Sequence, residues 1–167
     1  EQDAKIAGIA HECGKAVIIA VNKRDAIEKD NKTVKEFTSR VREVLSFMPY
    51  AEITFISAVT GQRLMKLYDI IDVVNENHSM RVATGVLNEI MAEAVALQQP
   101  PSDKGKRLRL YYITQVSVKP PTFVIFVNDK NLMHFSYTRY IENQIREAFG
   151  FRGTPLKFII RERKENR

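Results

Sequence analysis

The sequence predicts an α/β half-domain in residues 1–78, followed by a basic α+β module in residues 79–167. Short runs of β-branched residues alternate with amphipathic helical patterns in the first part, as in a doubly wound sheet. The second part reads instead as helix, two strands, helix and strand. The charge also changes at the boundary. The first part has 11 Lys/Arg and 12 Asp/Glu, a net charge of −1, whereas the second has 15 and 8, a net charge of +7.

The first part is expected to form helix, strand, helix, strand and helix. Apolar residues at helical spacing, a proline that ends the second helix and two short apolar strands support this order. The expected elements are Gln2 to Cys13, Ala16 to Val21, Thr33 to Met48, Ile53 to Ile56 and Gln62 to Asn77. We expect the first strand to be buried and the apolar stripes of the later helices to form the core. These stripes are Val34, Phe37, Val41, Val44, Leu45 and Met48, then Leu64, Leu67, Ile70, Ile71 and Val74.

The second part is expected to form a three-stranded sheet backed by two helices. Aromatic and β-branched residues favour the strands, and Ser136 is a suitable N-cap for the second helix. A turn from Pro100 to Gly105 ends the first helix. The expected elements are Thr84 to Gln98, Leu108 to Val118, Thr122 to Asn128, Tyr137 to Phe149 and Leu156 to Arg161.

Composition indicates a soluble globular chain with its thiol in a reducing compartment. Hydrophobic residues make up 44% of the 167 residues, and no apolar run reaches the length needed to span a bilayer. The single cysteine, Cys13, excludes an internal disulfide and is expected to pack on a helix. We therefore expect a cytoplasmic protein with no membrane contact. His11, His78 and His134 are isolated from one another in sequence, so no metal site is predicted.

The candidate ligand loop is Asn22-Lys23-Arg24-Asp25, which follows the first strand. Ligands of parallel sheets bind outside the carboxyl ends of the strands. Guanine presents two adjacent N–H donors that the Asp25 carboxylate can accept together, whereas adenine has no such pair. The Asn22 amide can face the O6/N7 edge or brace neighbouring loops, and the stem of Lys23 can cover the ring. Alone, these residues are equally typical of an ordinary turn after a strand.

A second strand end reduces the weight of that alternative. The predicted strand ending at Ile56 runs into Ser57-Ala58-Val59-Thr60-Gly61, a turn of small residues. The side chains of Ser57 and Ala58 would let a base approach closely, and a backbone N–H of Ala58 left free by the turn could donate to guanine O6. Two such loops at neighbouring strand ends predict a guanine site.

These two loops resemble the fourth and fifth nucleotide-binding motifs of the Ras-like GTPases. The wider sequence is similar to the bacterial ribosome-assembly GTPase family Der, also called EngA, over essentially the whole chain. Arg24 departs from the Trp or Leu expected at the variable position, where it should not disturb guanine contacts. The stretches that carry the wider resemblance are Gln2-Asp3, Ile6-Ala7-Gly8, Val17 to Val21 and the segment from Arg81 onward.

The resemblance implies a partial Ras-like P-loop GTPase domain followed by a KH-like domain. It implies a parent protein with two GTPase domains that binds GTP and GDP with Mg²⁺, hydrolyses GTP and supports assembly of the large ribosomal subunit by contacting rRNA. It also implies contacts between the KH-like domain and the GTPase domains. The sequence contains neither a Gly-x-x-x-x-Gly-Lys-Ser/Thr loop nor an Asp-x-x-Gly motif. We therefore expect a fragment that has no catalytic residue for GTP hydrolysis, binds no cofactor by itself and is inactive alone.

The basic module carries the candidate RNA contacts. Lys104, Lys106, Arg107 and Arg109 crowd the start of its first strand, with Tyr111 and Tyr112 beside them as stacking faces. A solvated basic surface with one tyrosine in the core is the simpler interpretation. The competing function is a non-enzymatic module that binds RNA or the ribosome and uses the α/β half as scaffold.

The stretch Gly150-Phe151-Arg152-Gly153 matches the Gly-x-x-Gly backbone clamp of KH domains. That clamp joins two helices, whereas this stretch joins a predicted helix to a predicted strand. We therefore favour a helix C-cap and tight turn over an RNA clamp.

Overall fold

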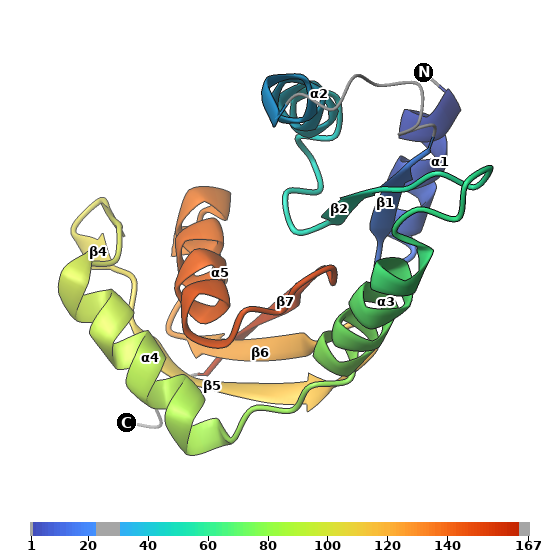
Figure 1. Cartoon of the computed structure of the whole chain (residues 1–167). Coiled ribbons are helices and arrows are strands. Elements are labelled where there is room, and N and C mark those ends of the chain that lie inside the picture. The colour runs from blue at the N-terminus through green and yellow to red at the C-terminus, as the bar shows by residue number, and fades with distance from the viewer. Residues whose placement is uncertain (1, 23–30, 164–167) are drawn as a thin grey trace. The chain divides into compact units, whose positions relative to one another are not determined.

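The computed structural model describes residues 2–22 and 31–163, which form two units (Figure 1). Unit 1 comprises Glu1–Ser79 with Phe151–Pro155, and unit 2 comprises Met80–Gly150 with Leu156–Arg167. The first division lies one residue from the boundary predicted from charge and composition. No sequence pattern indicated that residues 151–155 group with unit 1.

Unit 1 is a parallel two-stranded sheet with three helices. In the described residues β1 pairs with β2 in parallel, in a register that runs from Ile18 opposite Glu52 to Val21 opposite Phe55. The predicted order of elements is confirmed, and parallel strands joined by a helix are the basic unit of an α/β fold. The elements are α1 (Gln2–Glu12), β1 (Ile18–Val21), α2 (Asn31–Val44), β2 (Glu52–Phe55) and α3 (Leu64–His78).

The core of unit 1 is smaller than the apolar stripes predict. Leu45, Met48 and Ala51 form a buried cluster against residues of α1, α2 and β1. In contrast, Val44 is 62% exposed, Ile71 42% and Phe37 39%, and β1 is only half-buried. The expectation that β1 is buried was wrong. Of the two predicted stripes, Leu45, Met48 and Val74 are buried as expected, whereas Phe37, Val44 and Ile71 are exposed. Within the described residues β1 has one neighbouring strand, so its other edge is uncovered.

Helix α1 packs through small residues and a histidine. Ala4 and Ala7 contact the buried cluster, while Ile6 and Ile9 are exposed. His11 hydrogen-bonds through Nδ1 to the Tyr50 hydroxyl at 2.8 Å and stacks on the Tyr50 ring. The expected packing role of Cys13 was wrong, because this residue is exposed.

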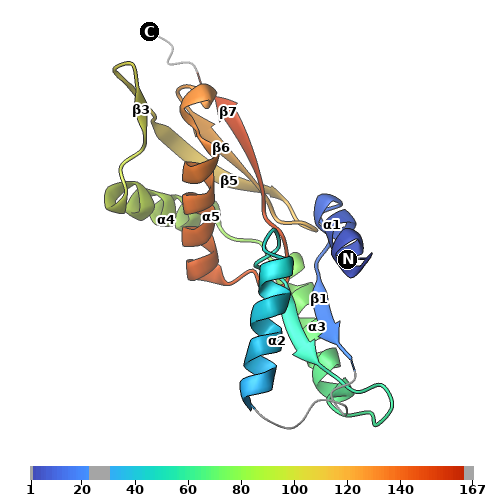
Figure 2. The same cartoon turned by 90° about the horizontal axis from the view of Figure 1, so that it is seen from above.

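Unit 2 contains a three-stranded sheet in the order β5-β6-β7, with β5 antiparallel and β7 parallel to β6. Helices α4 and α5 pack together over one face of this sheet (Figures 1 and 2). The predicted three-stranded sheet backed by helices is confirmed. The elements are α4 (Thr84–Leu97), β3 (Ser102–Asp103), β4 (Lys106–Arg107), β5 (Leu110–Ser117), β6 (Thr122–Val127), a 3-10 turn (Lys130–Leu132), α5 (Phe135–Phe149) and β7 (Lys157–Glu162). In residues 2–22 and 31–163, no helix is both long and apolar enough to cross a membrane.

Two tyrosines of α5 satisfy carbonyls at the end of α4. The Tyr140 hydroxyl donates to Ala94 O at 2.8 Å, and the Tyr137 hydroxyl donates to Gln98 O at 2.9 Å. Gln98 O lies at the C-cap, beyond the reach of intrahelical donors, whereas Ala94 O already accepts the Gln98 N–H at 3.0 Å and gains a second donor from Tyr140. Ser136 is not the N-cap of α5. His134 holds that place, because its carbonyl accepts from the N–H groups of Tyr137 and Thr138.

We expect Tyr137→Phe to lower the free energy of unfolding by about 1 kcal/mol at pH 7, because the hydrogen bond to Gln98 is lost. Burial, with a smaller contribution from Tyr140, raises the pKa of Tyr137 from 10.0 to about 12. The raised pKa favours the folded state below pH 10, and this contribution is lost as the pH rises through 12. Urea unfolding monitored by circular dichroism should therefore show less alkaline destabilisation in Tyr137→Phe than in the wild type.

The matched control for that experiment is Tyr68→Phe, because the Tyr68 side chain is 63% exposed on α3. It should leave both the stability at pH 7 and its alkaline decrease unchanged. Equal behaviour of the two variants would contradict the role of Tyr137.

Candidate functional site

The two strand ends of unit 1 meet through one hydrogen bond. Asn22 directly follows β1, and Ala58 lies in the loop that follows β2. The Ala58 N–H donates to Asn22 Oδ1 at 3.0 Å. Because β1 and β2 are parallel, their carboxyl ends share an edge, and this bond joins the two predicted guanine loops there.

Ser57 shapes the second loop from inside. Its side chain is fully buried, its Oγ accepts from the Thr60 N–H at 3.2 Å, and its own N–H donates to Gln62 O at 3.1 Å. Gly61 has a φ of 70°, a conformation that suits glycine at the end of such a turn. These contacts present Ala58, Val59 and Thr60 to solvent, with the Val59 side chain 88% exposed.

The structure brings together Asn22, Ser57 and Ala58 of the five predicted guanine-binding residues. Lys23 and Asp25 lie outside the described residues. Within this group, Ser57 supports the loop rather than offering its side chain to a ligand. The expectation that the Ala58 N–H is free was wrong, because Asn22 Oδ1 accepts it. Asn22 therefore takes the bracing role of the two that its side chain could perform.

Sequence reasoning missed the contribution of Gln62 and Arg63 to this loop. Gln62 acts through its backbone carbonyl, which no side-chain pattern reveals. Arg63 begins α3 with a φ of 62°, in the left-handed region. A non-glycine residue in that region is uncommon and is often found near functional sites.

The predicted RNA-binding residues of unit 2 surround a tight hairpin. Strands β3 and β4 are antiparallel, and Lys104 and Gly105 connect them with φ values of 47° and 79°. Two positive φ values are typical of a type I′ turn, whose twist matches that of a hairpin. The four basic side chains at and after this turn, Lys104, Lys106, Arg107 and Arg109, are exposed.

Asn128 fixes the backbone beneath these cations, a role that the sequence did not reveal. Its Nδ2 donates to Arg107 O at 3.0 Å, and its Oδ1 accepts from the Arg109 N–H at 2.8 Å. Its own N–H also donates to Arg109 O at 3.2 Å. The side chain thus ties the end of β6 to the segment between the hairpin and β5.

The structure places the two neighbouring tyrosines differently. Tyr112 stacks on Phe126 across the sheet, with the ring centroids 4.9 Å apart and the planes 9° from parallel. Tyr111, together with Arg107 and Arg109, lines a groove of about 480 Å³. Both tyrosines were expected beside the cations, and Tyr112 was named among the RNA-binding residues, but of the two only Tyr111 lines this groove. Tyr111 lies at an irregularity of β5, where the pairing with β6 shifts between Leu110 and Tyr112.

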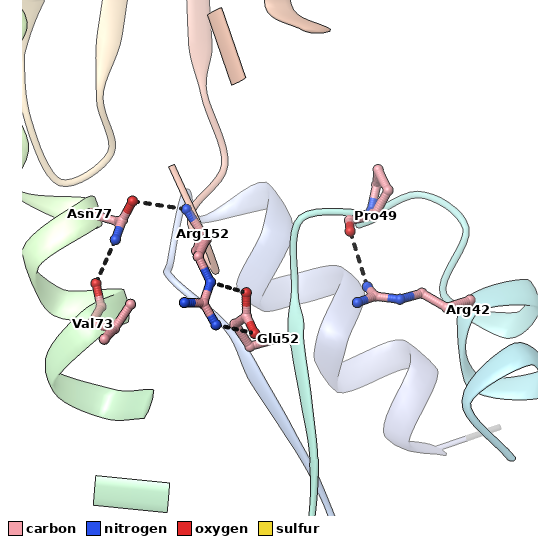
Figure 3. A network of polar contacts seen from close by, with 6 residues as sticks. All are labelled: Arg42, Pro49, Glu52, Val73, Asn77 and Arg152. Carbon is pink, nitrogen blue, oxygen red and sulfur yellow. Dashed lines mark hydrogen bonds and ion pairs between the residues drawn. The ribbon is translucent and has the colours of Figure 1, made fainter. Parts of the chain in front are cut away.

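The Gly150–Gly153 stretch caps a helix and then enters unit 1. Gly150 is the C-cap of α5, with its N–H donating to Arg146 O at 2.7 Å. The predicted helix C-cap is confirmed. The Arg152 N–H donates to Asn77 Oδ1 at 3.0 Å (Figure 3). The Gly153 N–H donates to Tyr50 O at 2.9 Å. A phosphate clamp needs such N–H groups, and here both have protein partners.

The Arg152 side chain adds an ion pair to the same segment. Its Nε and Nη2 donate to the two carboxylate oxygens of Glu52 at 3.0 and 3.1 Å (Figure 3). The hydrogen bonds to Glu52 and, to a smaller extent, its charge raise the pKa of Arg152. Glu52 begins β2, whose other end leads to Ala58.

The donor groups of the site suit a nucleobase rather than a metal. In residues 2–22 and 31–163, no group of three or more His, Cys, Asp or Glu side chains could hold a metal ion. The joined loops offer the Asn22 amide and a small exposed side chain at Ala58, which suit the edge of a base.

Comparison with known proteins gives one family-model match in unit 2 and relatives that match nearly the whole chain. Residues 81–161 match the family model described as KH-domain-like of EngA bacterial GTPase enzymes, C-terminal. A GTPase Der of Agathobacter rectalis is 78% identical over 166 residues, which cover 99% of this chain. A GTPase Der of Lachnoclostridium phytofermentans is also 78% identical, with the same coverage, and one of a Geobacillus species is 60% identical over 164 residues. The chain spans 38% of the length of each of these relatives.

Proposed function

We propose, because this chain belongs to the GTPase Der (EngA) family, that it supplies the guanine-reading edge and an RNA-contacting module of a GTP-binding protein. That protein hydrolyses GTP to GDP and phosphate and acts in assembly of the large ribosomal subunit. The site in this chain selects the base, and the phosphate-binding and catalytic groups belong to other parts of the full-length protein.

The hydrogen bond between Asn22 and Ala58 is the observation that carries the guanine proposal. It joins two loops that are 36 residues apart in sequence at the carboxyl edge of parallel strands. A base placed at this edge meets the Asn22 amide and the exposed Ala58 on one side. The Asp25 carboxylate, three residues after Asn22 in sequence, then accepts the two N–H donors of guanine.

The described residues fit the base of GTP or GDP, whereas Mg²⁺ requires oxygen ligands from elsewhere in the full-length protein. Bound Mg²⁺ would offset phosphate charge during phosphoryl transfer. Since the 167 residues contain no phosphate-loop motif, we expect the chain alone to bind nucleotide weakly and not to hydrolyse it.

The RNA part of the proposal rests on charge and its location. The net charge of +7 in residues 79–167 attracts phosphate chains through counterion release. Four of the cations lie within six residues at the hairpin. Ribosomal RNA is the polyanion that a ribosome-assembly protein of the cytoplasm would meet.

We test the guanine proposal with Asn22→Ala in a full-length protein. The matching 166 residues of the Agathobacter rectalis GTPase Der are replaced by this chain, so that the whole nucleotide site is present. Loss of the amide leaves the Ala58 N–H without its partner and separates the two loops. We expect the affinity for GDP, measured by titration calorimetry, to decrease about tenfold, as for one lost hydrogen bond.

Asn75→Ala is the matched control, because Asn75 is an exposed amide on α3. Its GDP affinity should equal that of the unmodified chimera. Equal affinities of the Asn22 and Asn75 variants would contradict the proposed site. A chimera that binds RNA but no guanine nucleotide would instead favour the non-enzymatic module.

A further inference from the structure

We propose that the groove between the end of α4 and the start of β5 binds one unpaired nucleotide of an RNA strand. This inference rests on the proposed RNA contact and specifies where and how it is made. The guanidinium groups of Arg107 and Arg109 bind the phosphates, and the base lies against Tyr111 and the apolar residues that line the groove. The projecting hairpin with Lys104 and Lys106 extends the phosphate track (Figure 2).

The shape of the groove suits a single base. Its volume is about 480 Å³, within the range of pockets that take small organic ligands. The groove is lined by the apolar residues Val95, Ala96, Pro100, Leu108 and Leu110 and by the polar residues Gln99, Arg107, Arg109 and Tyr111. Its two cations come from β4 and from the segment between β4 and β5. A ligand with one flat apolar part and one anionic part matches this division.

The groove is held in place by contacts beneath it. The Leu108 N–H donates to Pro101 O at 2.9 Å, so the hairpin closes on itself behind the basic residues. Leu108 is fully buried between Arg107 and Arg109, which places the two arginine side chains on the outer side. Asn128 fixes both arginine backbones through the three hydrogen bonds described above. Such preorganisation lowers the entropy lost on binding.

An unpaired nucleotide fits better than an acidic peptide or a duplex. Both an acidic peptide and a nucleotide would contact the arginines, but only the nucleotide has a flat aromatic face that can stack on Tyr111 and pack against the apolar residues of the groove. A duplex keeps its bases stacked inside, so it could offer the groove only its phosphates. Between Gln99 and Tyr111 the only acidic residue is Asp103, so the local charge favours a polyanion.

The test measures binding of the whole chain to a fluorescein-labelled 12-nucleotide oligouridylate and to an RNA duplex of 12 base pairs by fluorescence anisotropy. We expect R107A/R109A to weaken single-strand binding about tenfold or more. Tyr111→Leu should weaken it about tenfold by loss of stacking and should leave duplex binding unchanged. Tyr111→Phe keeps the ring and should bind like the wild type.

R139A/K157A is the matched control, since it removes two exposed cations of unit 2 that are not in the groove. It should weaken single-strand and duplex binding equally and by about threefold or less. Thermal melting of each variant confirms that it is folded, and the folded Tyr111→Phe variant allows a reading even where Tyr111→Leu is unstable.

Three results would overturn the inference. The first is that the wild type binds oligouridylate while the groove variants have the same affinity as R139A/K157A. In that case the groove is not the binding site, whereas the proposed RNA contact of unit 2 is kept. If the wild type binds no RNA at 50 mM salt, the RNA part of the proposed function fails together with the groove. If polyglutamate displaces oligouridylate at equal charge and Tyr111→Leu binds like the wild type, an acidic peptide is the better ligand.

Discussion

Gly153→Ala is expected to lower the free energy of unfolding of unit 1 by about 3 kcal/mol. Gly153 has a φ of 71°, and a side chain in this left-handed conformation costs about 1 to 2 kcal/mol. A Cβ built there would also overlap Val74 Cγ2 and lie 2.8 Å from Val74 Cγ1. Val74 is 4% exposed, so it has little room to move, and such overpacking costs about 1 to 3 kcal/mol. Urea unfolding and hydrogen exchange of the β1 amides measure the loss.

The backbone of Gly153 explains why the whole unit should respond. Its carbonyl accepts from the Val17 N–H at 2.7 Å, just before β1, and its N–H donates to Tyr50 O just before β2. A shift of Gly153 away from Val74 would lengthen both bonds. The segment from residue 151 to 155 therefore acts as a structural part of unit 1.

Two variants separate the causes. Gly8→Ala is the matched control, because a Cβ there meets no atom within 4 Å and alanine favours a helix, so it should stabilise slightly. Val74→Ala combined with Gly153→Ala should relieve the overlap, so the double variant should lose about 1 to 2 kcal/mol less than the sum of the single variants. Strict additivity, or no loss in Gly153→Ala, would contradict this packing.

Element order and type could be predicted from the sequence, since periodicity and turn residues report on local structure. The three strands of the larger sheet of unit 2 begin and end within two residues of the predicted bounds, whereas the short hairpin β3-β4 was not predicted and its first strand lies in the expected turn from Pro100 to Gly105. Burial could not be predicted as well. The apolar stripes of α2, with Val44, and of α3, with Ile71, indicate which face of each helix can pack against other residues. They do not indicate whether those residues lie within residues 1–167.

Hydrogen bonds between polar side chains and backbone groups distant in sequence could not be predicted either. Gln115 accepts from the Val82 N–H and donates to Met80 O, both at 2.8 Å. Asn88 makes a reciprocal pair with the backbone of Ile113 at 2.9 and 3.0 Å. Each is one polar residue within an apolar pattern, and only the folded chain shows which backbone groups it satisfies.

The candidate sites divide in the same way. The chemistry of guanine identified Asn22 and Ala58 as residues of one site, but not that they bind each other. The cluster of cations indicated an anion-binding surface. Only the geometry of β5 shows that Tyr111, rather than Tyr112, lies beside these cations. Residue types thus indicated the ligand class, and backbone geometry decided which side chains face it.

Asp25→Asn is expected to change which nucleotide the full-length chimera prefers. In the proposed site Asp25 accepts the two N–H donors of guanine, and an asparagine would offer one donor and one acceptor instead. Xanthine has a carbonyl where guanine has its amine, so the amide donor finds a partner there. A polar mismatch inside a binding site costs far more than a lost apolar contact, so we expect preference for GDP over XDP to decrease at least about a hundredfold.

The measurement is competition of GDP and XDP for a fluorescent guanine nucleotide bound to the chimera. Asp72→Asn serves as control, because Asp72 is an exposed carboxylate on α3 outside the two loops. A reversal toward XDP in Asp25→Asn alone would support a guanine-reading edge built by the two loops. An unchanged preference for GDP in the Asp25 variant, with nucleotide still bound, would contradict it.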